Sequence, residues 1–496
     1  MPPPDDDNNP LPPDYVTWVK KRIASRLASN EKSSWTIDMV PRNWRDVHKN
    51  AFLPEIIRIG PFRDGPFRNK EEPDHRLGVM EQHKVRFLNR LLGGELERQR
   101  RQMRTEEKRL LHVHERGEDD DGGRVAEALR LDDLLEAMRI LKPKTRAFYS
   151  EKYDLINNDV VFMEAMVVDG CFVVELLRLY NDRPPTESAG ESIEDDPILT
   201  NPQILTTLRR DLLLLENQLP FFVLEKLYEL INKKNNIDHQ QAVPLEVLAV
   251  TFFDPLLPQK NAASKLDPSR PKDHLLDVFR STFLKSVSEK VHNKGKNQAK
   301  SRLNPNGSIR GVVLHFASEL QEAGVQFQKW KGHDLLDIEF RHRTLRVPQL
   351  PLNDYTISLL LNFVGYELTV KHPEPFFTNY LMFWNSLVNS PRDVQILCKH
   401  RIINNMESEK EVAELLMRYR EVIYDLDLGY LYDEIKKVND YCERYYDSKY
   451  HVWWRSLIRE RFSSPWTCLS LFAAIILLLL TLLQTFYSLY AYYRPH

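Results

Sequence analysis

The chain has 496 residues, more than one typical domain of about 100–200 residues, so it can form two or three folded units. Apolar residues make up 42% and charged residues 28%, a balance that excludes a wholly disordered chain and supports a sizeable core. The net charge of −2 gives no global attraction to nucleic acid or to acidic substrates, so no nucleic-acid partner is expected.

Residues 1–35 predict a disordered, acidic, proline-rich tail followed by a short helix. The tail has neither a basic region nor an apolar stretch at its start, so it does not predict a secretory signal peptide. Tyr15 to Leu27 has apolar residues at helical spacing, typical of a short amphipathic helix.

Residues 36–461 are expected to form a mainly α-helical body with a few short β-strands. Pro54 to Phe62 has the pattern of a short strand stopped by Gly-Pro. Met80 to Leu92 begins a helix that should continue through Glu95 to Arg116, where charges of both signs are typical of a solvated helix face.

Two pairs of apolar helices are predicted next. Leu131 to Tyr180 carries two helices, and the second, from Asp159, is apolar nearly all round and should therefore be buried. Ile204 to Asn232 carries another pair, with Pro220 marking a kink or a break between them.

Three segments of the body are expected to be mobile insertions, at about 95–124, 181–202 and 257–310. The third has several prolines, and its part from Lys285 to Arg310 carries seven basic residues against the single acidic Glu289. A solvated insertion explains this charge, and so does a contact with anionic lipid headgroups. Both readings stay open.

The rest of the body should combine two short strands with helices. The strands are predicted at Asp334 to Phe340 and at Thr344 to Leu352. The helices are predicted at Gly311 to Ala323, Tyr355 to Glu367, Tyr380 to Asn389, Asp393 to Ile403, Val412 to Leu426 and Tyr432 to Arg461.

A stretch without any Asp, Glu, Lys or Arg runs from Phe462 to Tyr493. A bilayer core needs about 20 apolar residues in a helix, so residues 464–490 predict a single transmembrane helix, followed by a short tail at 491–496. Aromatic residues favour the two membrane–water interfaces, and the candidates here are Trp466, Tyr487, Tyr490, Tyr492 and Tyr493. The expected partner of this helix is a lipid bilayer.

The charges that flank the apolar stretch predict its orientation. Arg455, Arg459 and Arg461 precede it and only Arg494 follows, so the positive-inside rule places the body in the cytosol, on the plasma membrane or an endomembrane. The four cysteines lie far apart and form no disulfide framework, which agrees with a reducing compartment.

Enzyme motifs are missing from the sequence: there is no Walker loop, no H-E-x-x-H, no G-x-G-x-x-G and no G-x-S-x-G. We therefore assign no catalytic, cofactor-binding or metal-ligating residues and expect no cofactor. Carboxylates within apolar helices have two readings. They can form a catalytic pair with shifted pKa values, or they can be structural, paired with Arg178, Arg209, Arg210 or a loop amide. These carboxylates are Asp169, Glu175, Asp211 and Glu216.

Short motifs along the chain together resemble a plant family, the proteins that carry the domain of unknown function 247 (DUF247), also called UPF0481. The resemblance runs from about Val40 to Tyr493, and its most specific block is Asp211 to Leu224. The residues that carry it are Gly60, Pro61, Glu81, His83, Lys84, Asp169, Gly170, Glu175, Asp211, Glu216, Asn217, Gln218, Pro220 and Asp337. One departure is Leu361, which stands where the family usually has arginine.

The resemblance implies a plant protein, associated with a membrane, whose biochemical activity is generally unassigned. Some grass members of the family are implicated as pollen determinants of self-incompatibility. With no catalytic motif, we expect a non-catalytic recognition, signalling or scaffold protein that acts by protein–protein contact. Two alternatives remain, an enzyme of unrecognised type that uses the buried carboxylates and a scaffold on anionic lipid surfaces.

Overall fold

The fold is described from a computed structural model, which covers residues 36–61, 75–93, 96, 129–150, 158–183, 196–234, 242–289, 291, 314–331, 334–370, 375–405, 408–420, 429–447 and 465–493. Within these residues the protein is mainly α-helical with a few short strands, as the sequence predicts. The predicted helix at Tyr15 to Leu27 lies outside the described residues, and so does the helix continuation through Glu95 to Arg116 except for Leu96. Most of the basic residues between Lys285 and Arg310 also lie outside them.

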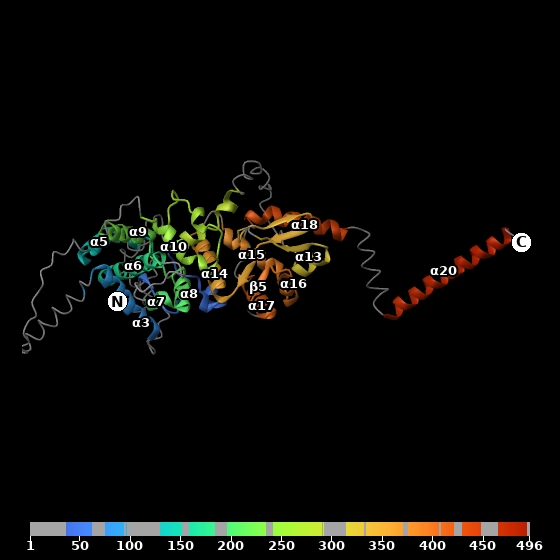
Figure 1. Ribbon diagram of the computed structural model, residues 1–496, viewed down its shortest axis with the longest axis horizontal. Helices are drawn as coiled ribbons and strands as arrows, with labels where there is room; N and C mark the ends of the chain where they lie inside the picture. The colour runs from blue at the N-terminus through green and yellow to red at the C-terminus, as the bar shows by residue number, and fades with distance from the viewer. Residues whose placement is uncertain are drawn as a thin grey trace, which may run out of the picture.

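The N-terminal part of the body is a packed group of helices around α6, seen at the left of Figure 1. Helix α6 packs against α3, α5, α9 and α10. The elements of this part are α2 (Arg42–Val47), η1 (Lys49–Ala51), α3 (His75–Leu91), α5 (Leu131–Ala147), α6 (Asp159–Asn181), α7 (Pro197–Thr200), α8 (Pro202–Asp211), α9 (Phe221–Lys234), α10 (Leu245–Phe253), η4 (Asp254–Leu256), η5 (Ala262–Lys265) and α11 (Leu275–Ser281).

Helix α6 occupies the centre because its sequence leaves it no polar face. Apolar side chains follow all sides of the helix, and neighbours must cover them to remove them from water. Asn158 caps its first turn by accepting a hydrogen bond from the backbone N–H of Val161. The buried helix predicted from Asp159 to Tyr180 is confirmed.

The C-terminal part of the body combines helices with two small sheets, seen to the right of α14 in Figure 1. Among the described residues, one sheet has the order β1-β3-β2, with β1 parallel and β2 antiparallel to β3, and β4 pairs with β5 in parallel. The elements are α13 (Ala317–Glu322), β1 (Gln326–Lys329), β2 (Glu339–Arg341), β3 (Thr344–Val347), β4 (Leu350–Leu352), α14 (Asp354–Thr369), α15 (Phe376–Leu387), α16 (Pro391–Lys399), β5 (Ile403–Asn405), α17 (Glu409–Arg420), η6 (Gly429–Leu431) and α18 (Tyr432–Asp447).

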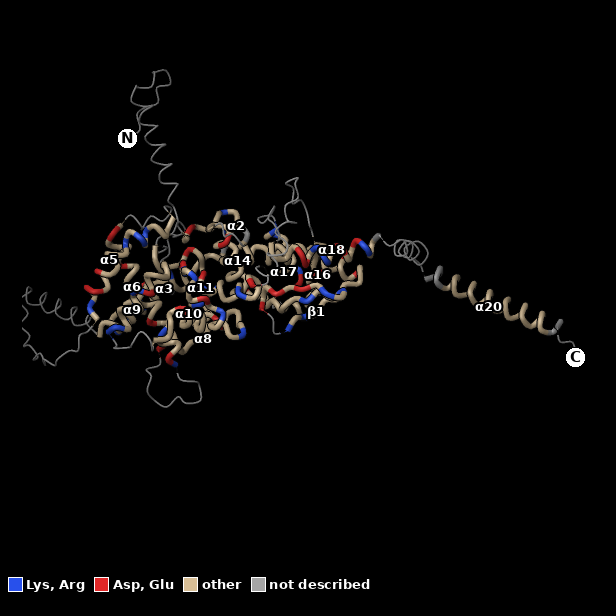
Figure 2. Tube along the Cα trace, turned by 90° about the horizontal axis from the view of Figure 1, so that it is seen from above, with Lys and Arg blue, Asp and Glu red and all other residues tan. Residues whose placement is uncertain are grey.

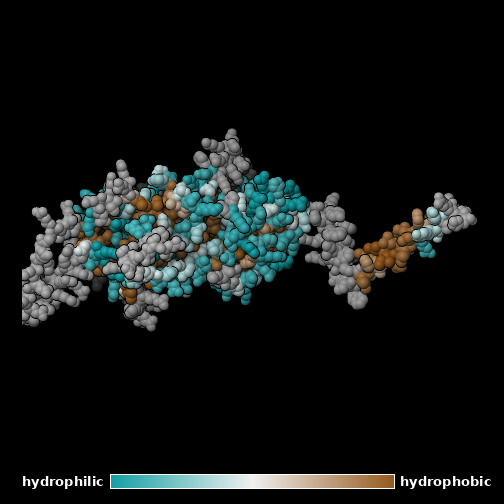
Figure 3. Space-filling view, in the orientation of Figure 1, coloured by the Kyte–Doolittle hydropathy of each residue, from teal (hydrophilic) through white to brown (hydrophobic). Residues whose placement is uncertain are grey.

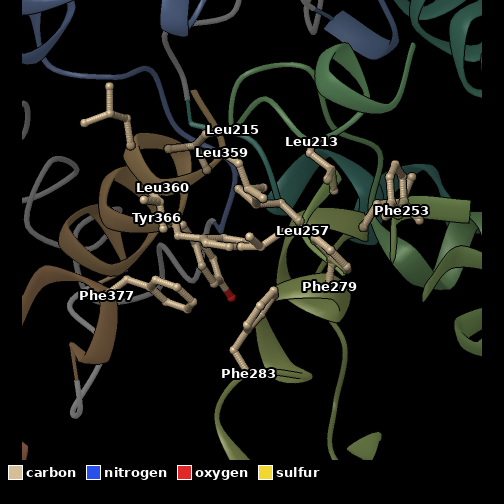
Figure 4. Close-up of a cluster of buried hydrophobic side chains, with 14 of the residues drawn as sticks. Leu213, Leu215, Phe253, Leu257, Phe279, Phe283, Leu359, Leu360, Tyr366 and Phe377 are labelled. Carbon is tan, nitrogen blue, oxygen red and sulfur yellow. The ribbon is translucent and has the colours of Figure 1, made fainter. Parts of the chain in front are cut away.

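One hydrophobic core runs through both parts of the body. Helix α14 joins them, since it contacts α8 and α11 on one side and α15 on the other. Figure 4 shows the junction, where Phe279 and Phe283 from the α11 region face Leu359, Tyr366 and Phe377. The aromatic rings of Phe279 and Phe283 lie 5.4 Å apart, edge to face, a favourable arrangement.

The structure corrects two predictions for the body. Pro54 to Phe62 does not form a strand within its described residues, because side chains take up its backbone N–H groups. The segment from Leu257 to Arg310 is not an insertion throughout, since residues 257–289 fold into η5 and α11 and bury Leu275 and Phe279 in the core. Its described prolines lie at a turn (Pro268) or in connecting loops (Pro258 and Pro271) between these elements, so composition alone gave the wrong prediction.

The single strand predicted at Thr344 to Leu352 is two strands, β3 and β4, which belong to different sheets because β4 pairs with β5. Other boundaries differ by a few residues or add short elements. Helices α8 and α9 are separate, and the break spans residues 212–220, so Pro220 marks its end. The loop predicted at Asn181 to Pro202 includes the short helix α7. Strands β1 and β5 were not predicted from the sequence.

Helix α20 (Pro465–Tyr493) stands apart from the body in composition and exposure. Its stretch Leu469–Tyr490 has 22 residues, a mean hydropathy of 2.4 and no buried residue. It is the apolar helix in Figure 3 and carries no charged residue in Figure 2. By length and composition it can cross a membrane.

Close packing of α6 against α9 depends on Gly170. A Cβ atom at this position would lie 2.4 Å from Cδ1 of Leu227, which is fully buried. We therefore expect Gly170→Ala to lower the free energy of unfolding by about 1–3 kcal/mol through overpacking. Denaturant unfolding of the full chain in detergent measures the change.

Gly78 in α3 is the matched control, because a Cβ there meets nothing within 4 Å. Gly78→Ala should raise the free energy of unfolding by about 0.5–1 kcal/mol through helix propensity. If both variants are stabilised equally, the α6–α9 contact does not constrain the core.

Candidate functional site

Buried polar side chains join the first described segment, residues 36–61, to the turn between α8 and α9. We call them the buried carboxylate cluster. Its three acids, Asp169, Asp211 and Glu216, are at most 2% exposed, and each holds a different part of the N-terminal segment. Its other members are Arg45, Lys84, Arg210, Asn217 and Gln218.

Asp211, the last residue of α8, holds the segment that the sequence predicted as a strand. Its Oδ2 accepts hydrogen bonds from the backbone N–H groups of Glu55, Ile56 and Ile57 at 2.8, 2.8 and 3.1 Å. Its Oδ1 accepts one from Arg210 at 2.8 Å. Burial raises the pKa of Asp211 to about 6, although these donors act in the opposite direction.

The turn after α8 continues this attachment with side-chain amides. Asn217 Oδ1 accepts a hydrogen bond from the backbone N–H of Ile59 at 2.7 Å, and its amide nitrogen donates to the carbonyl oxygen of Ile57 at 3.1 Å. Gln218 donates to two carbonyl groups within the turn, those of Leu212 and Leu214. The two amides therefore replace the helix hydrogen bonds that are lost at the break.

Glu216 holds the beginning of the segment. Its Oε1 accepts a hydrogen bond from the backbone N–H of Val40 at 2.6 Å and forms an ion pair with Arg45. Burial raises the pKa of Glu216, and Arg45 opposes this shift. The Glu216 carboxylate thus has partners within the protein and is shielded from solvent.

Lys84 and Asp169 form an ion pair between α3 and α6. Lys84 Nζ lies 2.8 Å from Asp169 Oδ1, and both side chains are 0% exposed. Asp169 Oδ2 accepts a hydrogen bond from the backbone N–H of Gly60 at 2.8 Å. Gly60 has φ +63°, and a Cβ there would lie 3.1 Å from the carbonyl oxygen of Gln218, so glycine fits this position best.

The remaining sequence-predicted residues lie around the cluster or away from it. Glu81 contacts Lys84 at 2.6 Å from the half-exposed face of α3, and Pro61 is buried after Gly60. His83 lies on α3, and partial burial and Arg86 lower its pKa. Asp337 lies far along the chain, where its side chain accepts from the backbone N–H of Asp334.

Glu175 and the arginines have the kinds of partner expected of a structural role. Glu175 pairs with Arg178 at 3.0 Å, and burial raises its pKa against the effect of that arginine. Arg210 pairs with Asp211, whereas Arg209 donates to the carbonyl oxygen of Phe252 and contacts no carboxylate in the described part of the chain. Of the three arginines that the structural reading named as possible partners, Arg178 and Arg210 thus pair with carboxylates and Arg209 does not.

A further buried ion pair was missed by sequence reasoning. Arg280 and Glu367 contact each other with both side chains 0% exposed. Glu367 also accepts from the backbone N–H groups of Phe377 and Thr378 and thereby fixes the start of α15. The only signal in the sequence is that Glu367 is a carboxylate at the end of a long apolar stretch.

His274 was also missed, and its sequence context gives no signal. It is fully buried at the start of α11, where Nδ1 accepts a hydrogen bond from the backbone N–H of Asp277 at 3.2 Å. Burial lowers its pKa to about 4, so the ring is neutral at physiological pH and serves as a helix cap.

The chemical capacity of the cluster follows from its burial and its partners. Backbone N–H groups, Arg45, Lys84 and Arg210 occupy the carboxylate oxygens, and solvent does not reach them. Among the residues that the structure describes, no group of three His, Cys, Asp or Glu side chains is placed to hold a metal ion. The cluster is therefore built to hold backbone segments together.

Six of the fourteen residues that carry the resemblance belong to the buried carboxylate cluster, and comparison with known proteins decides the family. The family model described as a plant protein of unknown function, DUF247, matches residues 37–480. The chain belongs to the DUF247 family. No solved structure matches this DUF247 protein.

Two curated relatives from Arabidopsis thaliana align over nearly the whole DUF247 chain. It is 28% identical to UPF0481 protein At3g47200 over 490 residues, which cover 96% of this chain and 91% of the relative. It is 22% identical to putative UPF0481 protein At3g02645, covering 95% and 94%. The relatives' names state no activity.

The Lys84–Asp169 pair predicts a large effect of a small substitution. Asp169→Asn keeps the side-chain shape but leaves the buried lysine without its closest carboxylate on α6. We expect the free energy of unfolding to fall by about 3–5 kcal/mol, measured by denaturant unfolding of the full chain in detergent. The double variant Lys84→Met/Asp169→Leu should recover part of this loss because it buries no charge.

Glu136→Gln is the control for this experiment, since it removes the charge of an exposed carboxylate paired with Arg139 on α5. It should leave the free energy of unfolding almost unchanged. An Asp169→Asn protein as stable as the Glu136→Gln protein contradicts a structural role for the buried pair.

Proposed function

We propose that this DUF247 protein is a membrane-anchored, non-catalytic recognition, signalling or scaffold component that acts by contact with other proteins. The observation that supports the proposal is that its buried carboxylates form ion pairs and hydrogen bonds that hold the fold together. Each conspicuous acid of the apolar helices has basic or backbone partners within the body, so no free acid–base pair remains at these positions.

Anchoring is supported by the exposed apolar surface of α20. Side chains such as Leu477, Leu478 and Phe486 are about two-thirds exposed and have no cover within the described body. Water does not favour a surface of this kind, whereas lipid tails do. Tyr487 and Tyr490 are exposed near one end, where an interfacial belt is expected; Trp466, Tyr492 and Tyr493 fall within α20, but their side chains lie outside the described residues.

The body is proposed to face the cytosol of a plasma membrane or endomembrane. This proposal depends on the three arginines that precede α20, Arg455, Arg459 and Arg461, against the single Arg494 that follows it. A role in self-incompatibility is supported by family resemblance alone and would need its own genetic test.

The proposed anchor and orientation can be tested together in plant cells. The body carries one glycosylation sequon, Asn306-Gly307-Ser308. A glycosylation acceptor placed after His496 should be modified while Asn306 stays unmodified, because the tail enters the lumen and the body does not. Ile476→Arg/Leu480→Arg should release the full chain from alkali-washed membranes, since each arginine costs about 2.5–3.5 kcal/mol in the bilayer centre.

Ile476→Leu/Leu480→Ile is the matched control and should remain in the membrane pellet. If the arginine variant also remains there, another segment anchors the protein. Glycosylation of Asn306 with an unmodified tail reverses the proposed orientation.

The protein-contact proposal makes a separate prediction. Lysine cross-linking of the full chain in native membranes should connect its body repeatedly to the same second protein, identified by mass spectrometry. The Glu136→Gln protein should keep these cross-links. The Asp169→Asn protein should lose cross-links only in proportion to its unfolded fraction, because the buried Lys84–Asp169 pair affects partner binding only by stabilising the fold. A folded Asp169→Asn protein that loses a catalytic turnover of the wild type would instead favour the enzyme alternative.

A further inference from the structure

A basic cavity opens between the β2–β3 turn and helix α18. Its volume is about 1080 Å³, and it is open to solvent. Its lining includes Arg341, His342, Arg343, Lys437, Tyr441 and Arg444, and we call this site the basic pocket. It lies in the C-terminal part of the body, at the end where Figure 1 shows α18 and α13.

Positive charge exceeds negative charge in the basic pocket. Of its two acidic residues, Glu339 is paired with Arg346 at 3.1 Å, and Asp440 lies on α18. Lys437 contacts Glu434 at 2.7 Å. In the described part of the chain, the exposed Arg341, Arg343 and Arg444 form no ion pair with a carboxylate, so their guanidinium groups can bind an anion.

Two of these arginines are held in place without losing their binding capacity. Arg444 Nε donates to the carbonyl oxygen of Asp440 at 2.9 Å, which leaves its two terminal nitrogens free to donate to a ligand. The Arg343 guanidinium lies 6.0 Å from the ring centre of Tyr441, whose hydroxyl donates to the carbonyl oxygen of Ala323.

The turn that carries Arg343 is unfavourable for its own residues. His342 and Arg343 have φ of +50° and +66°. A two-residue hairpin turn with two positive φ values favours Asn-Gly, because other side chains crowd the backbone there. Strained residues of this kind cluster at binding sites, and here the strain places a histidine and an arginine at the rim of the cavity.

The basic pocket is also lined by α18, the last described helix before α20. Helix α18 ends at Asp447 and α20 begins at Pro465, and the intervening residues 448–464 reach at most about 60 Å. This connection keeps the basic pocket near any membrane that holds α20, which raises the effective concentration of lipid headgroups.

We propose that the basic pocket binds the phosphate group of an anionic lipid headgroup in the membrane that α20 enters. Guanidinium groups match phosphate oxygens with paired hydrogen bonds, and three of them meet in this cavity. The proposal rests on the membrane anchoring proposed above. It differs from a lipid contact at Lys285 to Arg310, because it uses residues of the β2–β3 turn and α18.

The test uses the full chain in dodecyl maltoside, titrated by calorimetry with dioctanoyl phosphatidylinositol 4-phosphate. We expect saturable binding of one lipid per chain that weakens as salt is added. Arg343→Glu and Arg444→Glu should each weaken it about tenfold or more, since each removes a charge-assisted hydrogen bond. Lys436→Glu is the matched control on α18, because Lys436 is exposed but does not line the cavity, and it should change affinity less than about twofold.

Arg343→Gly separates binding from a structural role. Glycine relieves the positive φ, so this variant should have a higher melting temperature than the wild type, while its affinity for the lipid falls as in Arg343→Glu. An Arg343→Gly protein that loses affinity for the lipid while its melting temperature rises supports the proposal. If the role of Arg343 were purely structural, its replacement would lower the melting temperature.

Three results would overturn the proposal. Binding unchanged in both glutamate variants places the lipid elsewhere. Inorganic phosphate that binds as tightly as the lipid indicates a free-phosphate site, and a polyglutamate peptide that binds more tightly than the lipid indicates a protein partner. The titration contains no bilayer, so its outcome does not depend on whether α20 anchors the chain.

Discussion

The fold depends on the fact that buried charges and buried backbone donors both need partners. Residues 55–60 enter the core without helix or strand hydrogen bonds of their own, and the carboxylates Asp169 of α6 and Asp211 of α8 are fully buried in it. Each set satisfies the other, because Asp211 and Asp169 accept from these N–H groups. Lys84 and Arg210 then balance the charge, so the N-terminal segment is part of the core rather than a cover for it.

Some of this could be predicted from the sequence and some could not. Apolar residues follow all sides of both α6 and α20. Because α6 also carries charged residues and α20 carries none, the pattern predicts a helix buried in the body for α6 and an exposed apolar helix for α20. The carboxylates were recognised as unusual, but the partners of Asp169 and Asp211 in the N-terminal segment lie 109 to 156 residues away and follow no local pattern. The sequence also misled where prolines occur, since residues 257–289 belong to the core.

Short strands were the other limit of sequence reasoning. Strand β1 (Gln326–Lys329) has only four residues and pairs in parallel with β3, so neither its length nor a hairpin turn marks it.

The charged residues of the molecule fall into two groups, one buried and one at the surface. The charges that the sequence made conspicuous are enclosed and hold the fold, whereas the arginines around the β2–β3 turn lie at the surface in a segment where they look unremarkable. For a family without an assigned activity, surface charge is the more informative place to look.

The attachment of the N-terminal segment also sets an order for synthesis. Ile56 and the Asp211 carboxylate that binds its N–H group are 155 residues apart. A ribosome adds about 5–20 residues per second, so roughly 10–30 s pass between them. During that interval the N–H groups that Asp211 binds lack this partner, and a chaperone that recognises short apolar segments has time to bind Ile57 and Ile59. The part of the body made first is thus fixed in place only after α8 has been made.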